Sequence, residues 1–227
     1  MAFSVKWHGH ATLSLNINGA KVVVDPFFDD CPSAQTKAKQ IDADYILITH
    51  GHGDHVGDCM QIAGRTDALV ISNFEICNWV TAQGHSNVHA QHIGGSFDHP
   101  FGRVKLTVAF HGSALPDGSY GGMPAGFLIE AAEKRVYIAG DTALFSDMQL
   151  IGRGGLDLAI LPIGDNFTMG PDDALQAVKF LDPALVMPYH YNTWPPIVQD
   201  VNAWADRVRA ETNSQVVVLN VDEGYTL

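Results

Sequence analysis

The sequence predicts an α/β protein, a four-layer αββα sandwich in which two mixed sheets face each other and helices cover the outer faces. Three observations predict this fold. Short runs of β-branched residues recur along the 227 residues, and segments with helical periodicity separate them. Groups of strands precede groups of helices, and this order occurs twice. Two sheets packed face to face, with helices outside, satisfy that order.

The expected strands differ in how their apolar residues are distributed. Residues 12–17 alternate apolar and polar side chains, which is typical of a strand with one covered face. The runs 21–25 and 45–49 are almost continuously apolar, which indicates burial on both faces. The remaining expected strands are 69–72, 104–110, 126–131, 135–140, 156–162, 184–188 and 215–220.

The expected helices lie between these strands. They are 55–65, 73–84 with a glycine at its end, 170–182 with Pro171 in its first turn, and a final amphipathic helix at 197–211. Residues 112–125 are rich in glycine, proline and serine, so we expect a long loop that borders a site. No linker or low-complexity segment interrupts the chain, and we expect one domain over 1–227.

Composition excludes several classes of protein. Apolar residues make up 46% of the chain and charged residues 17%, which favours a buried core over disorder. The 25 acidic and 13 basic residues give a net charge of −12 without a dense basic cluster, so nucleic-acid binding is not expected. No apolar run approaches the roughly 20 residues that span a bilayer. The N-terminus lacks a signal-peptide pattern, and the three cysteines have no CxxC spacing, so we expect a cytoplasmic protein with reduced thiols.

The segment "THGHGDHVGD" gathers metal-binding side chains directly after the buried strand at 45–49. His50 and His52 are two residues apart in an extended segment, so they point to the same side and can reach one metal ion. Asp54 and His55 follow where a helix begins and can reach a second ion beside the first. A histidine-rich surface loop is the less favoured alternative, because such spacing is rarely accidental.

Three isolated candidates follow other apolar runs. His111 follows the strand expected at 104–110, Asp141 follows 135–140, and His190 follows 184–188 closely. Binding residues accumulate at the ends of strands in sheet proteins. Each residue alone could be an ordinary hydrogen-bonded polar group. Together they supply what the first cluster lacks, namely two more histidines and a carboxylate.

This pattern, HxHxDH followed by separate His, Asp and His, resembles the metallo-β-lactamase superfamily over nearly the whole chain. The segments "WHGHATLSLNINGAKVVVDPFF" and "LPIGDNFTMGPDDA" resemble a subgroup of small, uncharacterised metal-dependent hydrolases related to ascorbate-6-phosphate lactonases. The resemblance implies that Asp25 orients a ligand histidine. It also implies a complete ligand set, with His50, His52 and His111 on one metal, Asp54, His55 and His190 on a second, and Asp141 bridging them.

Histidine and carboxylate ligands without thiolate suit Zn²⁺ or Mn²⁺, with iron as a further option. Two such ions can share a water and generate a bridging hydroxide at neutral pH. We therefore expect hydrolysis of a small ester, lactone or phosphodiester, with Asp54 orienting the hydroxide. His10, in "WHGHAT", is expected to polarise substrate or to donate a proton. Its alternative role is a structural hydrogen bond at the start of a strand.

Other readings remain open from the sequence. An iron-dependent oxidoreductase of the same fold, similar to persulfide dioxygenases, would use much of the same ligand set. A metal-stabilised binding module is less favoured, because structural zinc sites are usually mononuclear and closed. Asn166, Thr168 and Met169 are expected to shape the pocket, whereas Trp194 is expected in the core or in an interface. The expected partner is a small-molecule substrate, and assembly into homo-oligomers stays open.

Overall fold

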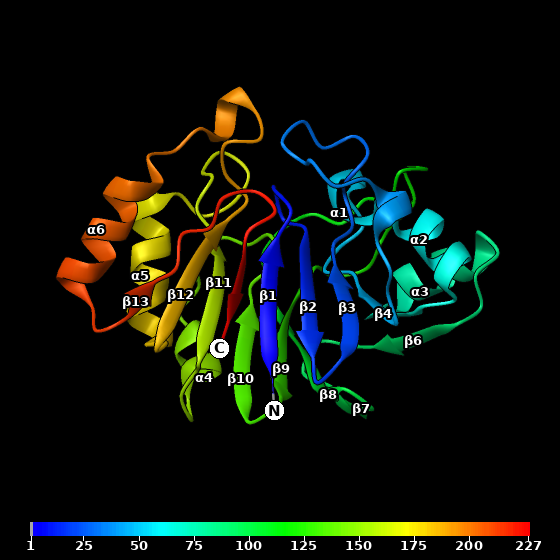
Figure 1. The fold of residues 1–227 in the computed structure, drawn as a ribbon, viewed down its shortest axis with the longest axis horizontal. Helices are drawn as coiled ribbons and strands as arrows, with labels where there is room; N and C mark the ends of the chain where they lie inside the picture. Colours follow the sequence, from blue (N-terminus) through cyan, green and yellow to red (C-terminus); the bar gives the residue numbers. More distant parts are fainter. Residues whose placement is uncertain (1) are drawn as a thin grey trace.

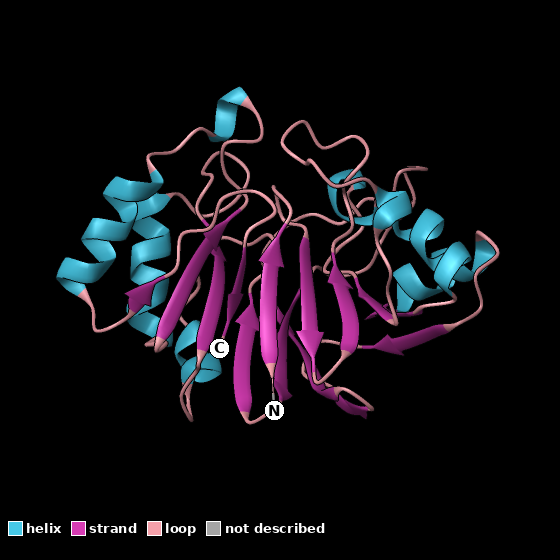
Figure 2. Ribbon diagram, viewed as in Figure 1, coloured by secondary structure: helices cyan, strands magenta, loops and turns pink. Residues whose placement is uncertain are grey.

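The computed structural model describes residues 2–227, and it confirms the αββα sandwich. Within those residues, two sheets of seven strands each lie face to face. Figure 2 shows the strands in the middle of the molecule and helices on either side of them. Both sheets mix parallel and antiparallel pairs, as predicted.

The first sheet is antiparallel at one side and parallel at the other. β1, β2 and β3 form an antiparallel meander, and β3 then pairs in parallel with β4. In sheet order its strands are β14 (Gly224–Thr226), β1 (Phe3–Trp7), β2 (Leu13–Ile17), β3 (Ala20–Val24), β4 (Tyr45–Leu47), β5 (Leu69–Asn73) and β6 (Val88–Gln91).

The second sheet repeats this design. Its antiparallel strands β7, β8, β9 and β10 lead into parallel pairs that begin between β10 and β11. In sheet order its strands are β13 (Gln215–Val216), β12 (Leu185–Tyr189), β11 (Leu158–Pro162), β10 (Lys134–Ile138), β9 (Ala125–Ala131), β8 (Gly102–Val108) and β7 (Ser96–His99).

Helices flank the two sheets on opposite sides of the molecule (Figure 1). On the side of the first sheet are α1 (Gly53–Val56), α2 (Cys59–Thr66), α3 (Phe74–Ala82) and the short helix η1 (Ala38–Gln40). On the side of the second sheet are α4 (Met148–Gly152), α5 (Pro171–Leu181) and α6 (Val201–Glu211), with the short helix η2 (Pro195–Ile197) in the loop before α6.

Strand β3 shows why a continuous apolar run is needed between two layers. Val22 and Val24 belong to the large cluster that fills the space between the sheets. Val23 points the other way, into a second cluster with Ile62 of α2 and Ile76 of α3. Because successive strand side chains alternate between faces, all three valines are buried.

The carboxyl ends of β3, β11 and β12 point to the same edge of the sandwich, at the top of Figure 1. The loops that follow these strands lie together at that edge. Several chemically versatile side chains are therefore gathered there from distant parts of the sequence, as expected where strands of an α/β sheet end.

The helix predicted at 55–65 is two helices in the structure. α1 ends at Val56 and α2 begins at Cys59, because the backbone N–H of Asp58 donates to the carbonyl of Pro26, 2.9 Å away, instead of continuing α1. The Asp58 carboxylate accepts hydrogen bonds from the backbone N–H groups of Phe28 and Asp29. The break thus ties the metal-ligand segment to the loop after β3.

The final helix begins four residues later than predicted, at Val201 rather than at residue 197. Residues 195–197 form η2, and Asp200 caps α6 by accepting hydrogen bonds from the backbone N–H groups of Asn202 and Ala203. The strand predicted at 215–220 ends at Val216. The chain then leaves the second sheet and returns as β14 beside β1 of the first sheet.

The three cysteines are buried as free thiols. Burial raises the pKa of Cys59 to about 12 and that of Cys77 to about 11. Thiolate is the reactive form, so a disulfide reagent is expected to titrate none of the three thiols of the native protein within minutes. In guanidinium chloride all three are expected to react. Rapid reaction of one thiol in the native protein would contradict the burial of the cysteines.

No helix within residues 2–227 is both long and apolar enough to cross a membrane.

Candidate metal centre

Seven predicted ligand residues converge at the edge where β3, β11 and β12 end. Within the described residues, their potential ligand atoms form three overlapping groups, and the atoms in each group lie within 4.8 Å of one another. The groups are His50, His52 and His111; Asp54, His55 and His190 together with His10; and His50, His55 and Asp141.

The first group comes from two loops. His50 and His52 follow β4, and His111 follows β8, which belongs to the other sheet. The Nε2 atom of His50 lies 3.0 Å from the Nδ1 atom of His52. The long loop predicted at 112–125 packs beside them. Its Leu115 lies so close to Gly51 that a Cβ atom added at Gly51 would be only 3.1 Å from the Leu115 side chain. Neighbouring imidazole nitrogens at such distances could bind one shared metal ion.

The second group is assembled mainly by α1 and by the end of β12. Asp54 lies in the first turn of α1, and His55 follows it in the same turn. His190 follows β12 directly in the chain. A Cβ atom on Gly164, at the end of the neighbouring strand, would lie only 2.3 Å from the His190 carbonyl. Glycine at position 164 therefore lets the two loops approach closely enough to place His190.

Asp141 lies between the two groups, as the resemblance implies for a bridging residue. Its Oδ2 atom is 3.6 Å from Nε2 of His111 on one side. On the other side it is 3.4 Å from Nε2 of His55 and 3.0 Å from Nε2 of His190. One carboxylate oxygen therefore contacts imidazole nitrogens from both groups.

These buried atoms lack ordinary hydrogen-bond partners, which tests whether the residues fit a metal. Among the described residues, neither Nε2 of His55 nor Nε2 of His190 has a hydrogen-bond partner, and Oδ1 of Asp141 also has none. The nitrogens are close to Asp141 but poorly aligned for hydrogen bonds. Unpaired buried polar atoms cost free energy, and metal coordination would satisfy them. The residues present fit a divalent metal.

The charges of the site also favour a cation. Burial would raise the pKa of Asp141, but His190 and His55 outweigh it and hold that pKa well below the usual range. At Asp54 the hydrogen bond from His10 and the nearby His55 likewise outweigh burial and lower the pKa. Both carboxylates are therefore ionised at neutral pH. Burial lowers the pKa of His50 well below its usual value, which leaves this imidazole neutral and able to coordinate.

Asp25 fixes the orientation of His55, the role that the resemblance implies. Its Oδ2 atom lies 2.8 Å from Nδ1 of His55, and both residues are fully buried. The carboxylate also accepts hydrogen bonds from the backbone N–H and the hydroxyl of Thr49. Burial opposes protonation of His55, but Asp141 and Asp25 outweigh it and raise the pKa of His55 well above its usual value. Because Asp25 accepts the Nδ1 proton, Nε2 is the ring nitrogen that faces the site, and a metal bound there would displace the Nε2 proton.

His10 lies behind Asp54 and has no exposed surface. Its Nε2 atom is 3.0 Å from Oδ2 of Asp54, and its Nδ1 atom is 2.9 Å from Oγ1 of Thr193. Burial, followed by the nearby His190, lowers the pKa of His10 to about 4, so the ring is neutral. Nε2–H then donates to Asp54, and Nδ1 accepts from Thr193. Direct contact with substrate, the role expected from the sequence, does not fit this position, whereas holding Asp54 does.

We expect His10→Ala to weaken metal binding about 10- to 100-fold, because Asp54 loses the group that orients it. His10→Gln keeps an N–H donor and is expected to restore most of the affinity. Competition with a chromogenic chelator measures both constants. Equal losses in the two variants would instead indicate that the His10 ring is itself a ligand.

A hollow of about 440 Å³ opens onto the predicted ligands. It is lined by three apolar residues, Phe167, Trp194 and Pro196, and by five candidate ligands, His52, Asp54, His111, Asp141 and His190. Trp194 was expected in the core or in an interface, but the turn at η2 brings it to the site. In the segment 166–169, Phe167 lines the hollow and Met169 is buried. The prediction that this loop borders the pocket is therefore confirmed. The lining residue is Phe167 and not the predicted Asn166, Thr168 or Met169.

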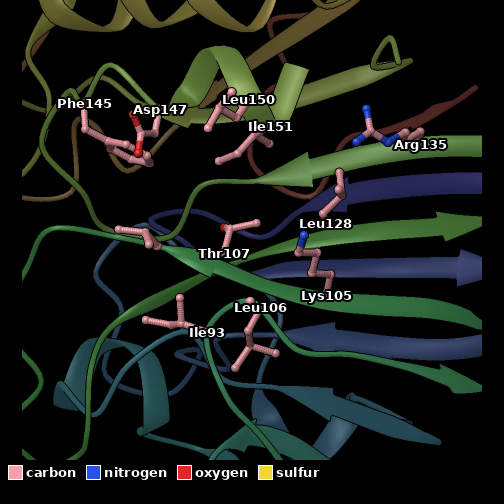
Figure 3. Close-up of a pocket in the computed structure, with 12 residues that line it drawn as sticks. Ile93, Lys105, Leu106, Thr107, Leu128, Arg135, Phe145, Asp147, Leu150 and Ile151 are labelled. Carbon is pink, nitrogen blue, oxygen red and sulfur yellow. The ribbon is translucent and has the colours of Figure 1, made fainter. Parts of the chain in front are cut away.

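A separate pocket of about 240 Å³ lies beside α4 and strands β8–β10 (Figure 3). Ile93, Leu128 and Ile151 contribute apolar surface, and Lys105 and Arg135 contribute cations. The guanidinium of Arg135 is already bound by Glu130 and by two backbone carbonyls. None of the described residues that line this pocket is a histidine, so it is not part of the candidate metal centre.

Comparisons with known proteins agree with this geometry. A family model described as the β-lactamase superfamily domain matches residues 20–191. The UPF0173 metal-dependent hydrolase of Bacillus cytotoxicus is 49% identical over 229 aligned residues, which cover 98% of this chain and 99% of the relative. The corresponding protein of Lysinibacillus sphaericus is 48% identical and covers 96% and 97%, respectively.

A solved structure is similar over the whole chain. Igni18, described as a metallo hydrolase of the archaeon Ignicoccus hospitalis, superposes with a TM-score of 0.90 at 34% identity. The alignment covers 100% of this chain and 99% of Igni18. Full-length similarity to these relatives, together with the converging histidines and carboxylates, establishes the family. This chain belongs to the UPF0173 metal-dependent hydrolases of the metallo-β-lactamase superfamily.

Proposed function

We propose that this protein is a dinuclear hydrolase of a small ester, lactone or phosphodiester. Two divalent ions, Zn²⁺ or Mn²⁺, would be held by the first histidine group and by Asp54, His55 and His190. The position of Asp141 carries this proposal, because its Oδ2 atom lies within 3.6 Å of imidazole nitrogens from both groups. A mononuclear structural site would leave one of these groups without a function.

The bound ions would supply Lewis acidity, which lowers the pKa of a coordinated water from about 16 towards about 7. Asp54 lines the hollow and is ionised, so its carboxylate can accept a hydrogen bond from the attacking water and orient it. His10 holds that carboxylate in place from the protein side. In hydrolysis the water oxygen bonds to the acyl carbon or phosphorus, the bond to the leaving oxygen breaks, and a proton passes to that oxygen.

Iron-dependent oxidation is the competing function, because it would use much of the same ligand set. The similar proteins from Bacillus, Lysinibacillus and Ignicoccus are all described as hydrolases, which supports hydrolysis. The buried cysteines lie outside the lining of the hollow, so the chain itself contributes no thiol to this chemistry.

The test begins with protein stripped of metal by a chelator and reloaded separately with Zn²⁺, Mn²⁺ or Fe²⁺. We expect about two ions per chain and hydrolysis of chromogenic carboxylic esters or phosphodiesters only after reloading. Oxygen uptake by the iron-loaded protein with a persulfide, without ester or phosphodiester hydrolysis in any metal form, would favour the oxidoreductase. Full hydrolytic activity in the stripped protein would contradict a metal-dependent mechanism.

A further inference from the structure

We propose that the substrate is an uncharged carboxylic ester or lactone with an apolar group that binds against Phe167, Trp194 and Pro196, here called the aromatic wall. This inference rests on the proposed hydrolytic function and narrows its substrate class. The aromatic wall stands directly beside the predicted ligands, in the same hollow of about 440 Å³. A hollow of this size accepts a small organic molecule.

Phe167 is positioned to bind substrate. It lies on the loop between β11 and α5, and 53% of its surface is exposed, although the neighbouring Met169 is buried. The backbone N–H of Met169 donates to the carbonyl of Thr142, 3.0 Å away, which anchors the base of the loop next to Asp141. An apolar ligand in the hollow would cover the exposed phenyl ring, and removing that surface from water favours binding.

Within the aromatic wall, Trp194 is held in place by contacts with neighbouring rings. Its ring centroid lies 4.7 Å from that of His10 in an edge-to-face arrangement and 6.2 Å from that of Phe27. These contacts hold the indole in place in the lining of the hollow. Rigid aromatic side chains bind apolar groups with little loss of conformational entropy.

Within the part of the chain that the structure describes, the hollow lacks a lysine or arginine that could pair with an anionic substituent. A carboxylate or phosphate attached away from the reacting bond would lie against aromatic carbon and lose its hydration without compensation. The lack of a lysine or arginine among the described residues of this lining argues against substrates that carry an additional anionic group.

A second hollow, of about 290 Å³, adjoins the first at His111. Its lining includes Phe110, Tyr120 and Met123, which are 58%, 69% and 49% exposed. Among the described residues, this lining also lacks lysine and arginine. Apolar surface therefore lies in both hollows that share His111, so the acyl group and the leaving group can each be apolar. Water adds to the acyl carbon, the acyl–oxygen bond breaks, and the products are an acid and an alcohol.

The test compares two chromogenic esters of equal chain length, p-nitrophenyl hexanoate and the mono-p-nitrophenyl ester of adipic acid. At the far end of the acyl chain, the hexanoate ester carries a methyl group and the adipate ester carries a carboxylate. We expect the metal-loaded protein to prefer hexanoate by at least about tenfold in kcat/KM, the scale of discrimination by an apolar pocket. Phe167→Ala is expected to lower kcat/KM for hexanoate roughly tenfold and that for the adipate ester by less than about twofold.

Phe167→Lys introduces the missing cation and is expected to shift the preference towards the adipate ester. Phe97→Ala removes a similarly exposed phenylalanine on β7 and is the matched control, with no expected change. Metal content is measured for every variant, so that damage to the centre is recognised separately from a change in specificity.

Preference for the adipate ester in the unmodified protein, or equal losses for both esters in Phe167→Ala, would overturn the apolar substrate class. Preference for bis(p-nitrophenyl) phosphate would overturn the carboxylic ester and leave metal-dependent hydrolysis intact. Absence of turnover with every substrate by fully metal-loaded protein would reject the proposed function and this inference together.

Discussion

Replacing Asp141 with asparagine is expected to lower the metal content from about two ions per chain to one or fewer, and to reduce hydrolysis more than about 100-fold. The carboxylate is buried and lies close to nitrogens of both ligand groups. Asparagine keeps the shape of the side chain but removes the negative charge that two cations would share. Elemental analysis of the purified protein, followed by ester hydrolysis under saturating metal, measures both effects.

Asp173→Asn is the matched control for this experiment. Asp173 is exposed in the first turn of α5 and does not line the hollow, so the same chemical change there should leave metal content and activity unaltered. Retention of two ions and of full activity in Asp141→Asn would contradict the bridging position. Loss of activity with both ions retained would assign Asp141 to the chemical step rather than to metal binding.

Asp25→Asn is expected to lower both stability and metal affinity. In this variant an amide NH₂ group would replace one of the two carboxylate oxygens that now accept hydrogen bonds from Thr49 and His55. The NH₂ group is itself a donor, so it would lie against another hydrogen-bond donor and repel it. Disrupting a buried charged pair costs about 3–5 kcal/mol, which corresponds to a decrease in Tm of roughly 10 °C for a protein of this size. Metal affinity should fall by a further 10- to 100-fold or so, because His55 loses its orientation.

Thermal unfolding in the presence of chelator isolates the effect on stability, and competition with a chelator measures metal affinity. Asp30→Asn, at an exposed position shortly after β3, is the control and should change neither quantity. A Tm within about 2 °C of the unmodified protein would show that the Asp25–His55 pair contributes little to folding. Normal metal affinity in the same variant would show that His55 is oriented by other contacts.

The ligand set was predictable because its residues carry local signals. His50, His52, Asp54 and His55 lie within six consecutive residues, and the spacing of His50 and His52 alone places these two on one side of the chain. Strand β4 was recognisable from its apolar run, so the position of this cluster at a strand end followed. The isolated residues His111, Asp141 and His190 each follow an apolar run, and the structure brings all three to the same edge.

The aromatic wall was not predictable in the same way. Phe167 and Trp194 belong to loops that no periodic pattern describes, and their sequence neighbours are polar or proline residues. Whether Phe167 or Met169 faces the site depends on left-handed backbone conformations at Asp165 and Asn166. Those turn residues tolerate such conformations, but the sequence does not say which of the following side chains they turn outward.

His10 shows the same limit for a buried residue. Its position before β2 was clear from the sequence, but its partners Asp54 and Thr193 lie 44 and 183 residues away. Only the packing of the first sheet against the loop after β12 brings these groups within hydrogen-bond distance. The change from a residue expected to touch substrate to one that positions a carboxylate follows from that packing.

The sequence by itself determined the αββα architecture, the family and the residues that converge as candidate ligands. Apolar periodicity and short-range spacing are properties of neighbouring residues, so they can be read from the sequence without knowledge of the fold. The tertiary structure decided the break between α1 and α2, the place of Asp141 between the two groups, the burial of His10 behind Asp54 and the apolar lining of the hollow. Each of these depends on contacts between loops far apart in the chain, whose geometry is set by the packing of the two sheets.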